Sequence, residues 1–195
     1  EMDLAQALRT RSFWILAFVL FCFYFYYLAV NLHLVAFLSD RGFSDARAAA
    51  SLGFAVGLGI VSKLAMGALV DRIAPRRALV LNFAILTAGS FLLLGAGQPG
   101  FLPLFLVAHG FATAAENVLL PVIVADCFGA RHLARIYGVL MVALVGGIAG
   151  QIFAGAAFDQ WGDYRVPFTT FAVLNVVALV ALFGVRRERG VDGSA

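Results

Sequence analysis

Long apolar runs alternate with short polar connections along the whole chain. The runs cover residues 12–38, 46–70, 77–96, 101–128, 133–158 and 164–185. A run of about 20 apolar residues is long enough to cross a hydrocarbon core roughly 30 Å thick. Backbone N–H and C=O groups cannot stay unpaired in lipid, so each run should be helical. The pattern therefore predicts an all-α polytopic membrane protein with six transmembrane helices.

The connections between the runs are short and rich in glycine, proline, aspartate and arginine. They read SDRGFSD, DRIAPRR, GQPG, GARH and DQWGDY. Such segments are typical of tight turns, and short turns force consecutive helices to run antiparallel. A division into three helices plus three helices at GQPG is conceivable, as in transporters built from inverted repeats.

Composition supports the membrane assignment and excludes several function classes. The chain has 195 residues, of which 63% are hydrophobic and 13% charged, and its mean hydropathy is +0.95; soluble domains have about 45–50% apolar and about 25% charged residues. Cys22 and Cys127 stand alone, which indicates neither a disulfide nor a zinc site. No nucleophile elbow, HExxH or phosphate-binding glycine loop occurs. We expect no enzyme activity, no metal and no cofactor.

The arginines gather on one side of the predicted bundle and set its orientation. That side would hold Arg9, Arg11, Arg72, Arg76, Arg77, Arg131, Arg135, Arg186, Arg187 and Arg189. The opposite side would hold only Arg41, Arg47 and Arg165, each near an aspartate. The positive-inside rule then puts both termini in the cytoplasm, and we interpret the net charge of +3 as membrane orientation and not as a nucleic-acid footprint.

Small residues recur at helical spacing inside two of the runs. Gly53 and Gly57 lie four apart, as do Gly146 and Gly150, and Ala154 continues the second row. Small residues at this spacing let two membrane helices approach closely. Tight packing is the favoured interpretation, and a moving hinge is the alternative.

Three stretches carry a family resemblance that covers almost the whole chain. GALVDRIAPRR (67–77) resembles the cytoplasmic loop signature of the major facilitator superfamily. AAENVLLPVIVADCFGARHLARIYG (114–138) and GGIAGQIFAGAAFDQWGDYRVPF (146–168) are similar to the carboxy-terminal half of bacterial members near the monocarboxylate and oxalate/formate branch. The resemblance implies half of a twelve-helix fold, built as a three-plus-three inverted repeat.

The resemblance also implies a division of the chain. Residues 1–11 would be the end of the central cytoplasmic linker, 12–186 the six-helix carboxy-terminal half, and 187–195 a cytoplasmic tail. The chain opens with Glu1 and not with methionine, so we expect a fragment. Its partner would be the missing amino-terminal half or a second copy of itself.

Lys63 is the strongest functional candidate. A lysine inside a span costs about 2.5–3.5 kcal/mol on insertion scales, so it usually faces a cavity or a partner. Snorkelling to the nearby cytoplasmic surface is the alternative. The resemblance implies that a basic residue at this place, four before Gly67, binds a substrate carboxylate.

Glu116 and two histidines are candidates for moving protons. Glu116 would lie at a depth similar to that of Lys63, where an isolated carboxyl group would take up a proton and one paired with the ammonium would stay ionised. A static ion pair is the alternative. His33 could relay protons or donate to an anion, and His109 could do the same, although a lone membrane histidine often only joins two helices.

Polar and aromatic residues beside these groups could form a cavity wall. Tyr24, Tyr27 and Asn31 form a stripe at helical spacing, and lipid-facing tyrosines near the interface are the alternative. Asn117 follows Glu116 directly. The predicted substrate-binding residues are Lys63, His33, Asn31, Tyr27 and Asn117, and the predicted proton-coupling residues are Glu116 and His33.

A conformational latch is expected at the cytoplasmic ends of the helices. An aspartate there can bond to the exposed N–H groups of a neighbouring helix start, and the resemblance implies that such a contact holds one conformation. The predicted members are Gly67, Asp71, Arg72, Arg76, Arg77, Asp126 and Arg135, with Asp126 and Arg135 as a pair. For the arginines, a role in topology alone is preferred.

Taken together, these features predict proton-coupled secondary transport of a small organic anion, resembling a monocarboxylate, across a bacterial inner membrane by alternating access. The sequence does not separate symport from exchange. An efflux carrier for hydrophobic compounds is the alternative within transport. A membrane scaffold or sensor with the same fold is the alternative outside it.

Overall fold

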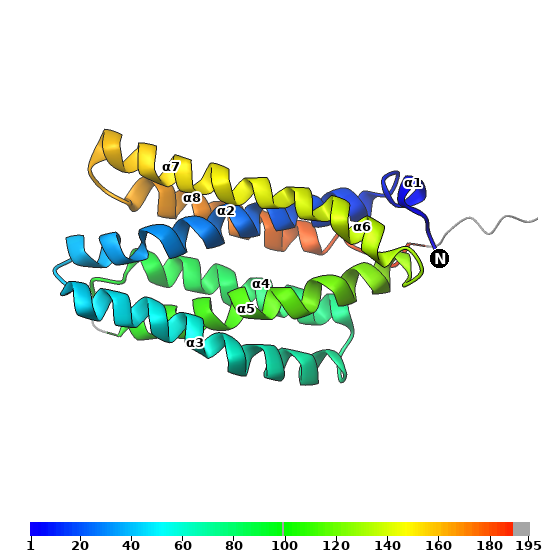
Figure 1. The fold of residues 1–195 in the computed structure, drawn as a ribbon, viewed down its shortest axis with the longest axis horizontal. Coiled ribbons are helices and arrows are strands. Elements are labelled where there is room, and N and C mark those ends of the chain that lie inside the picture. The colour runs from blue at the N-terminus through cyan, green and yellow to red at the C-terminus, as the bar shows by residue number, and fades with distance from the viewer. Residues whose placement is uncertain (99, 189–195) are drawn as a thin grey trace, which may run out of the picture.

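The six predicted spans are present as antiparallel helices in a computed structural model that describes residues 1–98 and 100–188 (Figure 1). They are α2 (Arg11–Asp40), α3 (Asp45–Val70), α4 (Pro75–Leu94), α5 (Phe101–Phe128), a fifth span over Leu133–Trp161, and α8 (Arg165–Leu182). A short helix, α1 (Leu4–Ala7), precedes them. No strand occurs among the described residues, which confirms the all-α prediction. Arg189 and most of the tail 187–195 lie outside the described residues.

The helix ends lie where the polar connections predicted them. Thr10 and Ser44 cap the starts of α2 and α3 by accepting backbone N–H groups. Pro75 occupies the first position of α4, where a missing N–H costs nothing. Gly129 and Gly162 follow α5 and α7 with φ of 93° and 65°, values that favour glycine.

The fifth span is not a single regular helix as its apolar run predicted. It consists of α6 (Leu133–Leu140), a 3₁₀ segment η1 (Met141–Leu144) and α7 (Val145–Trp161). A 3₁₀ turn is wound more tightly than an α-helix, and within a helix it often marks a hinge or a strained segment.

The core forms where the long helices pack in pairs. α2 lies against α7, α3 against α5, and α4 against both α5 and α8. Aromatic and aliphatic side chains fill the interior, with Tyr26, Phe23, Phe83 and Phe105 among the largest that are fully buried.

The glycine row in α7 lets this helix approach the backbone of α2 closely. A Cβ at Gly150 would lie 2.0 Å from the Phe25 carbonyl oxygen of α2, and one at Gly146 would lie 2.7 Å from the Phe21 oxygen. Tight packing is therefore confirmed for this row. At Gly53 and Gly57 of α3, by contrast, a Cβ would meet nothing within 4 Å.

Two helices leave wide apolar faces uncovered. On α3, Val56, Ile60 and Leu64 are 65%, 71% and 73% exposed. On the fifth span, Val142 and Ile152 are 69% and 67% exposed. In Figure 1, α3 and α7 form the two flanks of the bundle. The two ends of the described chain lie at the same end of the bundle, since Met2 and Glu188 donate to the carbonyls of Phe128 and Cys127.

Candidate functional site

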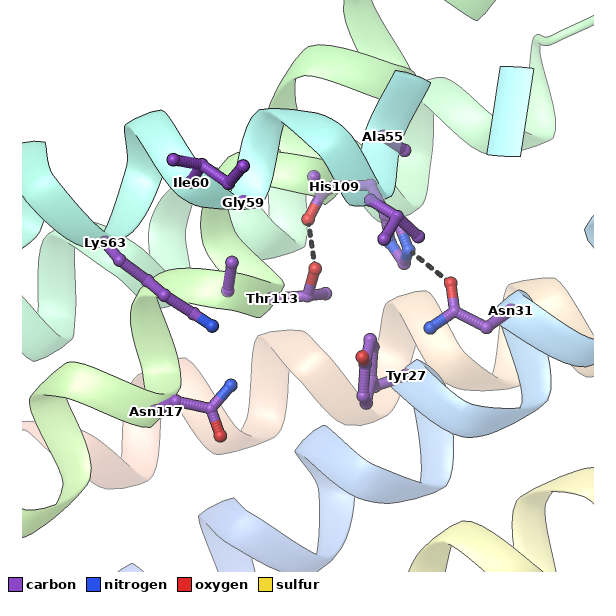
Figure 2. A pocket seen from close by; sticks show the side chains of 12 residues that line it. Tyr27, Asn31, Ala55, Gly59, Ile60, Lys63, His109, Thr113 and Asn117 are labelled. Atoms are coloured by element: carbon purple, nitrogen blue, oxygen red, sulfur yellow. Dashed lines mark hydrogen bonds between the residues drawn. The ribbon is translucent and has the colours of Figure 1, made fainter. Parts of the chain in front are cut away.

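A polar cavity of about 170 Å³ lies between α2, α3 and α5. Figure 2 shows the side chains that surround it. Its polar wall consists of Tyr27, Asn31, Lys63, His109, Thr113 and Asn117. Four of the five predicted substrate-binding residues are thus brought together here. The fifth, His33, is not part of this wall.

Three helices position the wall residues by simple spacing. His109, Thr113 and Asn117 are four residues apart on α5, so they project from one face of that helix. Tyr27 and Asn31 have the same spacing on α2. α3 comes close to α5 at Gly59, where a Cβ would lie 2.9 Å from the Ala114 Cβ. This close approach brings Lys63, one turn further along α3, to the edge of the cavity.

Lys63 directs its side chain toward α5, with the ammonium on the side of Asn117 and Thr113 (Figure 2). Within residues 1–98 and 100–188, the ammonium makes neither a hydrogen bond nor an ion pair. Its three N–H donors therefore remain available to a guest in the cavity.

His109 connects the cavity wall to the core. It is 1% exposed. Its Nδ1 lies 2.7 Å from the Tyr26 hydroxyl, and its Nε2 lies 3.2 Å from Asn31 Oδ1. An amide oxygen can only accept, so Nε2 carries the proton and Nδ1 accepts from Tyr26. Asn31 is thereby held with its amide nitrogen turned into the cavity (Figure 2).

Glu116 lies beside the cavity wall but not in it. Glu116 is 2% exposed, and its Oε2 accepts from Asn82 Nδ2 of α4 at 3.2 Å. The same amide nitrogen donates to the Ala112 carbonyl at 3.0 Å. No cation of the described chain lies within 4.0 Å of Glu116, so the expected alternative of an ion pair with Lys63 is absent from this part of the chain.

His33 joins three helices on another side of α2. Its Nε2–H donates to the Gln151 carbonyl of α7 at 3.2 Å, and its Nδ1 accepts from the Tyr164 hydroxyl at 3.2 Å. Gln151 returns a bond from its own amide to the Leu28 carbonyl at 3.3 Å. These contacts fasten α2 to α7. Tyr24 also lies outside the cavity wall, with its hydroxyl 3.9 Å from Met141 Sδ.

The predicted latch residues lie at the end of the bundle that carries the chain ends. Gly67 and Asp71 end α3, with Asp71 as the C-cap, and Arg72 follows in the turn. Among the described residues, the Asp71 side chain has no hydrogen-bond partner and no ion-pair partner. Arg76 donates to the Phe183 carbonyl at the end of α8.

Asp126 pairs with Arg187 and not with Arg135, so the predicted pairing is wrong. The segment after α8 crosses the end of α5, where the Glu188 N–H donates to the Cys127 carbonyl at 3.0 Å. This crossing puts Arg187 beside Asp126, whose hydrogen bonds hold the pKa of Arg187 above its ordinary value.

The sequence reasoning missed one wall residue, Thr113. Its position four residues after His109 and four before Asn117 on one helix face was the signal that could have identified it. Among the described residues, no three His, Cys, Asp or Glu side chains come together to hold a metal.

Comparison with known proteins agrees with this architecture. The sequence profile of the Major Facilitator Superfamily matches residues 60–194. The chain is 29% identical over 145 residues to monocarboxylate transporter 13 of Rattus norvegicus, and the match covers 73% of this chain and 34% of the rat protein.

Solved structures of the fucose:proton symporter FucP of E. coli share the fold. One superposes with a TM-score of 0.80 at 16% identity, over 95% of this chain and 45% of the symporter. The outward conformation of FucP gives 0.79 at 16% identity, over 94% and 45%. The chain thus spans less than half the length of each of these proteins. Because the family profile covers well over half of the chain and the fold agrees with it, this chain belongs to the Major Facilitator Superfamily.

Proposed function

We propose that this chain forms one half of a secondary transporter that moves a small organic anion by alternating access. The observation that carries the proposal is the Lys63 ammonium, which borders a small polar cavity and has no partner within the described chain. An ammonium in the membrane interior usually faces the bundle interior, a water-filled cavity or a partner group. The name of the rat relative, a monocarboxylate transporter, supports a monocarboxylate as the guest.

The other wall of the site would come from a second six-helix unit. In the part of the chain that the structure describes, the cavity has walls from α2, α3 and α5 only, and α3 and the fifth span leave apolar side chains uncovered. An amino-terminal half or a second copy of this chain would cover these faces. Asp71 would act as the latch by accepting hydrogen bonds from the exposed N–H groups at a helix start of that unit. Both termini of this chain would lie in the cytoplasm.

Reconstitution tests this proposal. The full-length protein in phosphatidylcholine vesicles should take up labelled acetate and butyrate faster than empty vesicles, and it should not take up the neutral analogues acetamide and butyramide. Uptake of the amides with equal efficiency would contradict an anion carrier and favour transport of hydrophobic compounds. Uptake of neither class would favour a membrane scaffold.

Glu116 is proposed as the proton carrier. Its carboxyl group is buried and accepts one hydrogen bond from a neutral amide, and a lone carboxylate is costly to bury in the charged form. The group would hold a proton while α4 covers it and release the proton when α5 moves and admits water.

We expect Glu116→Gln to abolish the stimulation of uptake by an inward proton gradient while leaving acetate exchange at zero gradient. Glutamine keeps an oxygen that can accept from Asn82, so the packing of α4 on α5 is retained. The assay compares initial uptake with and without the gradient in both proteins. His33→Gln is the matched control, and gradient dependence that is lost in this variant but kept in Glu116→Gln would transfer the role to His33.

His109 is proposed to position the amide of Asn31 for the anion. We expect His109→Phe to raise the KM for acetate about 5-fold with little change in maximal rate, since the hydrogen bond that orients Asn31 contributes about 1 kcal/mol. Initial-rate kinetics in vesicles measure this. In an Asn31→Ala background, His109→Phe should cause no further rise in the KM for acetate, because both substitutions remove the same hydrogen bond between His109 and Asn31. Fully additive effects would contradict the positioning role.

A further inference from the structure

A second cleft opens between α4 and α8, at the end of the bundle that carries the chain ends. Its volume is about 590 Å³. Its apolar wall consists of Val80, Leu81 and Ala84 from α4 and Phe183 from the end of α8. Leu81 and Phe183 are 45% and 62% exposed. No residue of this cleft belongs to the anion cavity, whose walls are α2, α3 and α5.

Two arginines stand at the mouth of this cleft. Arg76 and Arg77 lie in the first turn of α4. Arg76 uses one donor on the Phe183 carbonyl. The ion pairs of the described chain are Arg186 with Glu188 and Arg187 with Asp126, so neither arginine of the cleft has a carboxylate within 4.0 Å. A guanidinium carries five N–H donors in a fork that matches a phosphate, so most of these donors remain free.

The depth of these groups selects the kind of guest. At 1.5 Å per residue, Ala84 lies about 12 Å deeper along α4 than Arg76. With the arginine-rich end at the cytoplasmic surface, as the positive-inside rule predicts, the arginines would stand at the level of the lipid headgroups and the apolar wall would continue into the hydrocarbon. A guest that satisfies both parts has an anionic phosphate at one end and a hydrocarbon chain at the other.

We propose that this cleft binds an anionic phospholipid. Its phosphate would lie on Arg76 and Arg77, and one acyl chain would lie along Val80, Ala84 and Phe183. The arginine-rich side of a membrane protein faces the cytoplasmic leaflet, where anionic lipids attract clustered basic residues. The competing explanation is that the arginines only bind the last carbonyls of α8. That explanation accounts for one donor of Arg76 and for none of Arg77.

The test uses the full-length protein in phosphatidylcholine nanodiscs with and without phosphatidylglycerol. A lipid that binds only the folded protein stabilises it by mass action, so phosphatidylglycerol should raise the unfolding midpoint of the wild type by about 2–4 °C. Native mass spectrometry should show phosphatidylglycerol retained after mild detergent extraction. Arg76→Gln combined with Arg77→Gln should remove both effects. Arg9→Gln combined with Arg131→Gln carries the same charge loss and should keep them.

A second variant tests the cleft itself and covers a failure of the double variant to fold. Ala84→Phe keeps both arginines but fills the apolar wall, and it should also lose the retained lipid. A phosphatidylglycerol effect that survives both variants would overturn the proposal. The same midpoint rise with inorganic phosphate in pure phosphatidylcholine would also overturn it, because the site would then bind a free anion. If the partner half occupies the cleft, the wild type would retain no phosphatidylglycerol and its midpoint would not change, and the proposal would be overturned.

Discussion

Replacing Lys63 with alanine is expected to raise the KM for acetate and butyrate about 10- to 150-fold. A hydrogen bond to a charged group contributes about 1.5–3 kcal/mol, and each 1.4 kcal/mol is a factor of ten in affinity. The ammonium has no partner in the described chain to replace, so its removal leaves no unpaired charge behind. The fold should therefore survive, and the loss should appear in binding alone.

Two variants make this result specific. Lys63→Arg keeps the charge at the cavity edge and should retain most of the affinity, although the larger planar group fits differently. Val177→Ala on α8 changes a side chain that is 47% exposed, outside the cavity wall and on neither uncovered flank, and it should behave as wild type. Initial rates in vesicles give both constants. An unchanged KM in Lys63→Ala would remove the anion anchor from the mechanism.

Replacing Gly150 with valine is expected to prevent stable folding. Even the first carbon of the new side chain would lie 2.0 Å from the Phe25 carbonyl oxygen and 2.8 Å from its carbon. These are backbone atoms and cannot rotate away, so α7 must separate from α2 along the whole glycine row. Overpacking in a core costs typically about 1–3 kcal/mol, and a backbone clash should exceed that range. Thermal unfolding and monodispersity in detergent measure the effect.

The matched control for Gly150 lies five residues further along α7. A Cβ at Gly155 would lie 3.8 Å from His33 Cε1, an ordinary contact distance, and alanine favours a helix by about 1 kcal/mol over glycine, so Gly155→Ala should keep or slightly raise the unfolding midpoint. If Gly150→Val and Gly155→Ala unfolded at the same temperature, the close approach of α2 and α7 would be wrong.

The spans were predictable because the bilayer imposes them through length alone. The run 46–70 became α3, Asp45–Val70, and the run 77–96 became α4, Pro75–Leu94. In each case a polar turn bounded the apolar stretch. No polar turn in the sequence marks the 3₁₀ segment η1 that interrupts the fifth span, because Met141–Leu144 is as apolar as the residues on either side. A tighter turn inside an apolar helix depends on packing against neighbours, which the linear pattern does not contain.

The site was only partly predictable because lipid removes the contrast between the faces of a helix. His33 and His109 both lie in the third of an apolar helix that is farther from the chain ends, yet His109 borders the cavity and His33 holds α2 to α7. In a helix of a soluble protein, polar residues mark the face that contacts water. In these membrane helices the face toward lipid and the face toward the core are both apolar. The partner of Asp126 was unpredictable for a different reason, since it depends on where the segment after α8 turns.

The uncovered glycines of α3 have a consequence for how this chain meets a neighbour. Lipid solvates valine and leucine about as well as another helix does, whereas a bare backbone gains van der Waals contact when a second backbone comes near. Adhesion on this flank should therefore concentrate at Gly53 and Gly57, which meet nothing within 4 Å and lie about 6 Å apart along the axis. A contact this short would act as a hinge, and the two six-helix units could tilt about it while they stay in contact.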